Sequence, residues 1–424
     1  MTEKIIREKA IIVGVNVNNR NDFEESMEEL GSLAEACNIV VVGRIDQNLR
    51  KPQPQYYVGT GKVDEIRLAI EAEDAELVVI NHELTPSQLR NLERALSIRV
   101  VDRTNLILEI FERRAKTREA KLQVEAAHLQ YLLPRLIGSY ENLGRQSGGV
   151  GTKNKGVGEK KLELDRRKVE QKIHDLNREI ELIAVERTTQ RKRRADTELP
   201  SVALVGYTNS GKSTLLNAML DLYSRSENKR VFEKDMLFAT LETSVRQIKL
   251  PDRKVFTLSD TVGFVSELPH DLVKAFRATL EEVKHADLLL HVIDYSSENF
   301  EKHIEVTLET LREIGADEVP MLFVYNKLDR VKGKPPVIAT DVETVTISAK
   351  EKWGLDELVT KIKAHLFSDY IDCTLEIPHD DGKLLAYLNE HTAIKDTEYL
   401  ELATRLKVEC SPLDYKKLEQ YVVR

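Results

Sequence analysis

The sequence predicts an α/β protein of several domains, and three patterns in its 424 residues lead to this class. Short apolar runs alternate with amphipathic stretches over residues 1–104 and, at a more regular pitch, over residues 199–368. Residues 105–198 between them carry apolar side chains at helical spacing, and a short mixed segment, 369–424, follows the second alternating region. We therefore expect four domains with these boundaries.

Residues 1–104 predict a small α/β domain. The runs typical of strands are 10–17, 38–43, 77–80 and 98–101, and those typical of helices are 22–36, 62–73 and 86–97. Gly59–Lys62 leads into the second helix, where its N–H groups form either a phosphate-binding nest or a simple turn. The segment is shorter than a phosphate-binding loop, which favours the turn.

Residues 105–198 predict a basic helical hairpin. Apolar side chains recur three, four or seven residues apart over 105–137 and 160–190, and two such helices pack most simply as antiparallel neighbours. The glycine- and lysine-rich stretch 144–158 between them is either the mobile tip of the hairpin or a flexible linker.

The charge of the chain is unevenly distributed. The net charge is −8, yet residues 111–200 hold 21 Lys and Arg against 14 Asp and Glu, a local charge of +7 that leaves −15 for the rest. A basic segment within an acidic protein is typical of an element that faces a polyanion. Few aromatic residues interrupt it, so we expect contacts with phosphates rather than stacking on bases.

Residues 199–368 predict a doubly wound parallel sheet. The expected strands are 201–206, 255–260, 288–294, 321–326 and 344–348. Residues 369–424 are typical of a small α+β domain with one strand, a helix, two strands and a second helix. That last segment shows no cluster of His, Asp or Cys that would carry chemistry.

The first strand of this sheet leads into G-x-x-x-x-G-K-S, a phosphate-binding loop. The glycines let backbone N–H groups turn toward phosphates, and the following helix adds its N-terminal dipole. We expect Lys212 to reach the β- and γ-phosphates and the Ser213 hydroxyl to ligate Mg²⁺. The loop consists of Gly206, Tyr207, Thr208, Asn209, Ser210, Gly211, Lys212 and Ser213.

Two later strand ends predict guanine as the base of the nucleotide. Asp329 can accept hydrogen bonds from N1–H and N2–H₂ of guanine, whereas adenine has no donor at N1. A backbone N–H of the second motif can donate to the guanine O6. The two motifs are Asn326, Lys327, Leu328 and Asp329, and Ser348, Ala349 and Lys350.

Two segments between the phosphate and base motifs predict a switch. Asp260 would hold Mg²⁺ through a water, the Gly263 N–H would contact the γ-phosphate, and Thr240 would be a second hydroxyl ligand of Mg²⁺. Loss of the γ-phosphate removes the last two contacts. The segments are Asp260, Thr261, Val262 and Gly263, and Leu237, Phe238, Ala239, Thr240 and Leu241.

The residue after Gly263 bears on hydrolysis. Ras-like GTPases have a glutamine there that orients the attacking water, and Phe264 cannot form that hydrogen bond, so we expect slow intrinsic hydrolysis. In potassium-stimulated GTPases an asparagine at the place of Asn209 helps to hold K⁺ against the phosphates. Asn209 either does the same or only shapes the loop. The expected catalytic residues are Lys212, Thr240, Gly263 and Asn209.

The chain resembles the HflX family of GTPases in motifs that reach to about residue 368. They include GYTNSGKST, LFATLET, DTVGFV, NKLD and SAK, and in the N-terminal half VVDRTNLILEIFERRAKTREAKLQVEAAHLQYLLPRL and GGVGTKNKGVGEKKLELDRR. The family's arginine and proline are absent from the loop at 155–160, and Glu242 stands where aspartate is common.

The resemblance implies a ribosome-associated GTP hydrolase. Such a protein binds the large ribosomal subunit and the 70S ribosome and splits stalled or idle ribosomes, with the hairpin facing rRNA. It would use Mg²⁺, and also K⁺ if Asn209 takes the first of its two roles, and we expect a monomer. One alternative is an RNA-binding assembly, remodelling or antibiotic-protection factor that uses GTP as an allosteric switch. Another is a signalling GTPase without nucleic-acid partners, which leaves the basic segment unexplained.

Composition indicates a cytoplasmic protein. No apolar run reaches the roughly 18 residues of a membrane-spanning helix, and MTEKIIREKA lacks the apolar core of a secretory signal. The three cysteines include no CxxC pair, which argues against a disulfide scaffold or a cysteine zinc site.

Overall fold

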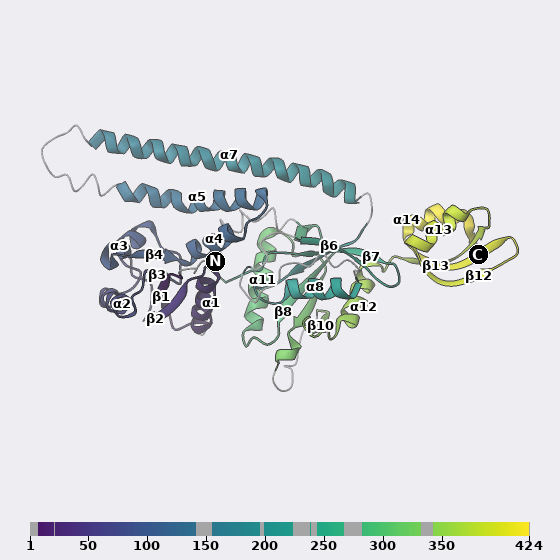
Figure 1. Ribbon diagram of the computed structural model, residues 1–424, viewed down its shortest axis with the longest axis horizontal. Coiled ribbons are helices and arrows are strands. Elements are labelled where there is room, and N and C mark those ends of the chain that lie inside the picture. The colour runs from purple at the N-terminus through teal and green to yellow at the C-terminus, as the bar shows by residue number, and fades with distance from the viewer. Residues whose placement is uncertain are drawn as a thin grey trace, which may run out of the picture. The chain divides into compact units, whose positions relative to one another are not determined.

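The computed structural model describes residues 7–20, 22–140, 155–195, 199–223, 238, 244–266, 282–331 and 342–423. They belong to two compact units (Figure 1). The first unit comprises Met1–Thr189, Asp235–Glu242 and Val265–Ala278. The second comprises Gln190–Lys234, Thr243–Phe264 and Thr279–Arg424. Of the two short segments from the middle of the sequence, the described residues in the first unit are Phe238, Val265 and Ser266.

A parallel sheet of order β2-β1-β3-β4 forms the centre of the first unit. Its strands are β1 (Lys9–Val17), β2 (Val40–Leu49), β3 (Leu77–Ile80) and β4 (Arg99–Asp102). Helices α2 (Thr60–Glu73) and α3 (Pro86–Leu96) lie on one side of the sheet, and α1 (Phe23–Ala36) lies on the other (Figure 1). All residues of β3 are buried, as expected for a strand covered on both faces.

The hairpin region contains a break that the apolar periodicity did not predict. The expected helix over 105–137 is in fact two helices, α4 (Arg103–Arg114) and α5 (Arg118–Tyr140). Ala115 has an extended backbone that ends α4, and the Thr117 hydroxyl accepts a hydrogen bond from the Ala120 N–H, 3.2 Å away, at the start of α5. Periodicity continues across the break because both helices bury a face in the same unit.

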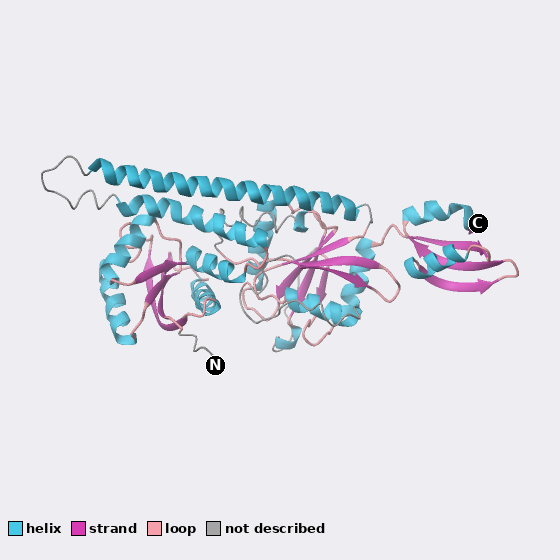
Figure 2. Cartoon of the chain, turned by 45° about the horizontal axis from the view of Figure 1, so that its top comes forward, coloured by secondary structure: helices cyan, strands magenta, loops and turns pink. Residues whose placement is uncertain are grey.

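Helix α5 and the long helix α7 (Lys155–Ala195) run side by side (Figures 1 and 2). Ion pairs Arg118–Glu179, at 2.8 Å, and Lys172–Glu125, at 3.0 Å, fix them as antiparallel neighbours. Helix α7 starts at Lys155, so residues 155–158 are helical and not part of the expected tip. Residues 144–154 of that tip lie outside the described residues.

The second unit contains a sheet of order β10-β9-β8-β5-β7-β6. Its strands are β5 (Ser201–Val205), β6 (Ser244–Lys249), β7 (Val255–Asp260), β8 (Leu288–Asp294), β9 (Met321–Asn326) and β10 (Thr344–Thr346). Helices α8 (Lys212–Tyr223) and α12 (Leu355–Leu366) pack on one face, and α11 (Phe300–Ile314) packs on the other. The sheet is thus doubly wound.

The edge strand β6 is a correction to the expected sheet, because it pairs antiparallel with β7. Only Ile248 of its six residues is buried, so the apolar pattern that predicts a strand is nearly absent. The other neighbouring pairs of the sheet are parallel.

An antiparallel sheet of order β12-β13-β11-β14 follows within the second unit. Its elements are β11 (Ile371–Pro378), α13 (Gly382–His391), β12 (Ala393–Tyr399), β13 (Ala403–Cys410), α14 (Pro412–Leu418) and β14 (Val422–Val423). The short β14 was not predicted. No described helix combines the length and apolar character that a membrane span requires.

Candidate functional site

The loop between β5 and α8 turns sharply at two glycines. Gly206 has φ +145°, and a Cβ there would lie 2.2 Å from the Val292 carbonyl oxygen. Gly211 has φ +95°, and a Cβ there would lie 2.3 Å from Nδ2 of Asn326. Both positions therefore exclude any larger residue, and the loop wraps closely around the start of α8.

The ammonium of Lys212 lies inside this loop. Its Nζ donates hydrogen bonds to the carbonyl oxygens of Gly206, at 2.9 Å, and Tyr207, at 2.7 Å. The side chain is 6% exposed, and burial lowers its pKa to about 8, although the nearby Asp260 carboxylate opposes this shift. A buried cation held by neutral carbonyls is well placed to bind the more strongly accepting oxygens of a phosphate.

Oxygen atoms suited to Mg²⁺ and phosphate gather beside Lys212. The Ser213 hydroxyl donates to Oδ2 of Asp260 at 2.6 Å, and Asp260 is fully buried at the end of β7. Hydroxyl and carboxylate oxygens are the hard ligands that Mg²⁺ prefers. The buried hydroxyls of Thr208 and Ser210 have no hydrogen-bond partner among the described residues. These residues therefore fit a bound phosphate with its metal ion.

Asn326 connects the phosphate loop to the two base motifs. Its Nδ2 donates to the Ser210 carbonyl at 2.9 Å, and its Oδ1 accepts from the Ala349 N–H at 2.9 Å. Both atoms belong to a side chain that is 2% exposed at the end of β9. The sequence motif placed Asn326 near the base, and the structure brings the two ends of the site together through it.

The remaining base residues surround the same strand ends. The Ser348 hydroxyl donates to Oδ1 of Asp329 at 2.6 Å, which orients that carboxylate. Lys327 has φ +65° and pairs with Asp294 at 2.7 Å. Lys350 is exposed, and Leu328 begins a short 3₁₀ turn (Leu328–Arg330).

Phe264 is built into the phosphate loop. Its carbonyl accepts from the Thr208 N–H at 2.7 Å, and its N–H donates to the Gly206 carbonyl at 3.2 Å. The ring is 1% exposed. Phe264 therefore joins the loop to the Asp260–Gly263 segment, and its buried ring has no group that could hydrogen-bond a water. Asn209 is exposed at the rim of the loop with φ +58°.

Two histidines near the loop were not predicted as part of the site. His303 of α11 stacks on the Tyr207 ring, with centroids 4.0 Å apart and planes at 17°. His291 of β8 is 1% exposed, and burial together with the Lys212 charge lowers its pKa to about 3, so it is neutral. The sequence signal for His291 was a histidine inside the apolar run 288–294. Periodicity alone does not distinguish such a histidine from an ordinary core residue.

Part of the expected switch lies beyond the described residues. Leu237, Ala239, Thr240 and Leu241 are outside them, so Thr240 as a ligand of Mg²⁺ stays a prediction. Phe238 is described, and it is buried in the first unit. Its ring meets the edge of Phe111 at a centroid distance of 4.7 Å.

Comparison with known proteins covers nearly the whole chain. Three families match, described as "GTP-binding GTPase N-terminal" over residues 24–112, "GTP-binding GTPase Middle Region" over 114–194 and "50S ribosome-binding GTPase" over 201–327. GTPase HflX of Caldanaerobacter subterraneus is 40% identical over 421 residues, which are 99% of this chain and 96% of that protein. GTPase HflX of Escherichia coli K12 is 39% identical and covers 97% of this chain and 95% of that protein.

One solved structure with similarity is a GTP-binding protein from Sulfolobus solfataricus in complex with GDP. It is 26% identical, with a TM-score of 0.45, and the match covers 85% of this chain and 99% of that one.

Proposed function

This chain belongs to the HflX family of GTPases and is a GTP hydrolase, and on that premise we propose that it splits stalled or idle ribosomes. In this proposal it binds the large ribosomal subunit in the GTP state, with the hairpin of α5 and α7 facing rRNA. The family match to a ribosome-binding GTPase domain supports the partner. The distribution of charge on the hairpin supports the assignment of the hairpin as the rRNA-facing element.

In the second half of the hairpin, that charge is concentrated around the two ends of α7. Residues 141–162 hold five Lys and Arg against two Asp and Glu, and residues 187–200 hold five against two. The middle of α7, residues 163–186, holds five against seven. There Arg166 pairs with Glu170 at 2.8 Å and Arg167 with Glu163 at 3.0 Å, both within α7. Lys172 pairs with Glu125 of α5 at 3.0 Å. Contact with phosphates is therefore expected at the ends and not along the middle.

The nucleotide site would control this contact through the γ-phosphate. In the proposed arrangement Lys212 holds the β- and γ-phosphates, and Ser213 and Thr240 bind Mg²⁺ with Asp260 in support. The Gly263 N–H contacts the γ-phosphate, and Asp329 selects guanine. Mg²⁺ would neutralise charge on the phosphates during transfer to water. The site residues proposed are those of the five motifs named above, with Asn209 as the position for K⁺.

The experiment is sedimentation of 70S ribosomes with this protein and GTP, GDP or a non-hydrolysable analogue. GTP and the analogue are expected to convert 70S particles to free subunits, and GDP is not. Unchanged 70S profiles with every nucleotide would contradict splitting. If free structured RNA binds instead and ribosomes do not stimulate hydrolysis, the remodelling alternative replaces the proposal.

A matched pair of variants tests the hairpin. The tip variant, named for the basic residues in and before the start of α7, replaces Lys153, Lys155, Lys160 and Lys161 by alanine. The control variant replaces Arg166, Arg167, Lys168 and Arg178 in the middle of α7 and keeps the Lys172–Glu125 pair with α5. Each phosphate contact contributes about −0.7 to −0.9 to the slope of log affinity against log salt. The tip variant should therefore bind large subunits with a slope shallower by about 3, while the control keeps the wild-type slope. Equal slopes for both variants would remove the tip from the interface.

A further inference from the structure

We propose that Asp102 and Arg103 are positioning residues that link the segment after Gly263 to the first helix of the hairpin. The two are consecutive in the chain, at the junction of β4 and α4, and both are buried, with 0% and 2% exposure. The inference rests on the proposed function, because it names how the GTP site would be connected to the hairpin. All the contacts that carry it lie within the first unit.

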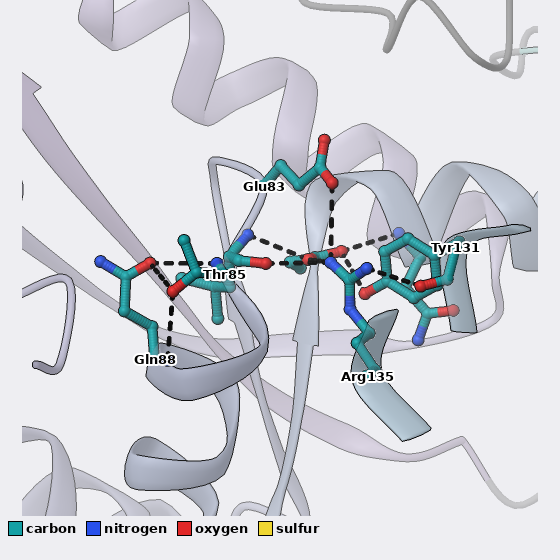
Figure 3. Close-up of polar contacts among 8 residues, drawn as sticks. Glu83, Thr85, Gln88, Tyr131 and Arg135 are labelled. Atoms are coloured by element: carbon teal, nitrogen blue, oxygen red, sulfur yellow. Dashed lines mark hydrogen bonds and ion pairs between the residues drawn. The ribbon is translucent and has the colours of Figure 1, made fainter. Parts of the chain in front are cut away.

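Asp102 is directed toward the hairpin. Its carboxylate accepts a hydrogen bond from the Tyr131 hydroxyl at 2.8 Å and from the Arg135 guanidinium at 3.1 Å, both on α5 (Figure 3). Arg135 also donates to the Leu84 carbonyl at 2.9 Å, and its guanidinium carbon lies 3.3 Å from the centre of the Tyr131 ring. Helix α5 is thus attached to the sheet by a stacked and hydrogen-bonded pair.

The same carboxylate is fixed from the sheet side. It accepts a hydrogen bond from the Asn105 N–H at 2.8 Å, and this bond caps the start of α4. It also accepts a hydrogen bond from the Leu84 N–H at 3.0 Å. Burial, together with the Asp102 charge, raises the pKa of Tyr131, so its hydroxyl keeps its proton and stays a donor at neutral pH. Asp102 therefore cannot move without disturbing the start of α4 and the contact with α5.

Arg103 is directed away from Asp102. Its guanidinium pairs with the Glu29 carboxylate, donates to Oδ1 of Asn81 at 3.1 Å and donates to the Ser266 carbonyl at 3.2 Å. Asn81 is itself held by a hydrogen bond from its Nδ2 to the Ser26 hydroxyl at 2.8 Å. The planar guanidinium can hold several acceptors in fixed directions, which a lysine cannot do.

The contact with Ser266 connects this cluster to the nucleotide. Ser266 lies three residues after Gly263, whose N–H is the proposed γ-phosphate contact, and 163 residues from Arg103 in the sequence. A shift of Gly263 on loss of the γ-phosphate would pull on the Ser266 carbonyl. Because Arg103 follows Asp102 directly, the shift would reach Tyr131 and Arg135 through one peptide unit.

Two conservative variants test the link in the full chain. Arg103→Lys keeps the positive charge beside Glu29 but loses the planar guanidinium that donates to the Ser266 carbonyl. Tyr131→Phe removes the hydroxyl that donates to Asp102. Matched controls are Arg113→Lys, on the same α4 but bonded to the Cys37 carbonyl, and Tyr387→Phe, whose hydroxyl donates to Asp414. Neither control side chain takes part in the contacts of Asp102 and Arg103 described above.

The readout is hydrogen exchange of the α5 backbone over 118–136, with a GTP analogue or GDP bound and without ribosomes. Wild type and controls should exchange more slowly with the analogue, by about fivefold or more, the usual lower range of coupling between sites. Both variants should lose this difference while their GTP affinity stays within twofold of wild type. If Arg103→Lys does not fold, Tyr131→Phe decides alone.

The proposal is overturned if the folded variants keep the nucleotide-dependent difference, or if wild type shows none. Failure of ribosome splitting would leave this result intact, since no ribosome is present. With large subunits added, the ratio of affinities in the analogue and GDP states should fall about tenfold in both variants. An unchanged ratio would also overturn the proposal.

Discussion

Replacement of Asn326 by alanine should separate the phosphate loop from the base motifs. The substitution removes two buried hydrogen bonds, one to the Ser210 carbonyl and one from the Ala349 N–H, both at 2.9 Å. Each buried group left without its partner costs about 1–3 kcal/mol, so the total is about 2–6 kcal/mol. This cost is divided between the free energy of unfolding and the free energy of nucleotide binding.

The two free energies can be measured in parallel. Urea unfolding gives the loss of stability, and titration with a fluorescent guanine nucleotide gives the loss of affinity, for which about 1.4 kcal/mol corresponds to tenfold. The control is Asn389→Ala, because Asn389 also donates to a carbonyl but lies exposed on α13. That control should change stability by about 0.5 kcal/mol or less. If Asn326→Ala likewise leaves the sum of both losses below about 1 kcal/mol, the proposed bridging role is refuted.

Three further predictions concern the nucleotide. Asp329→Asn should transfer preference from guanine to xanthine nucleotides, because the carboxylate that accepts from N1–H is lost. Competition binding with GTP and xanthosine triphosphate measures this preference. Unchanged GTP selectivity would contradict the prediction. GTP affinity should fall as pH rises above about 8, by up to about tenfold per pH unit. The reason is that Lys212 in the nucleotide-free protein then loses the proton that phosphate binding requires. A GTP affinity that stays constant from pH 7 to 10 would contradict this. Single-turnover hydrolysis should be faster in KCl than in NaCl, and Asn209→Ala should abolish the difference; equal wild-type rates remove the K⁺ site.

The sequence was most informative where burial and backbone geometry restrict residue type. Strands β1, β3, β5, β8 and β9 were predicted because parallel strands covered on both faces are apolar throughout. The phosphate loop was predicted because Gly206 and Gly211 have conformations and close contacts that only glycine allows.

The features that were missed depend on contacts distant in sequence or on weak patterns. Strand β6 lies at the edge of the sheet and has one buried residue, so its sequence lacks the apolar pattern that predicts a strand. The break between α4 and α5 at Ala115 leaves the apolar spacing intact and shows only in the backbone. The side chains of Asp102 and Arg103 point in opposite directions because their partners lie far away in the sequence. Tyr131 is 29 residues from Asp102, and Ser266 is 163 residues from Arg103. No local rule of propensity or capping contains that information.

The most direct test of the account is the affinity of purified large ribosomal subunits for this protein in two nucleotide states. The account predicts binding that is at least about tenfold tighter with a non-hydrolysable GTP analogue than with GDP, a typical size for coupling between sites. The same preference should weaken when the tip lysines are replaced. Equal affinity in both states would contradict the claim that the γ-phosphate governs how the basic hairpin engages its RNA.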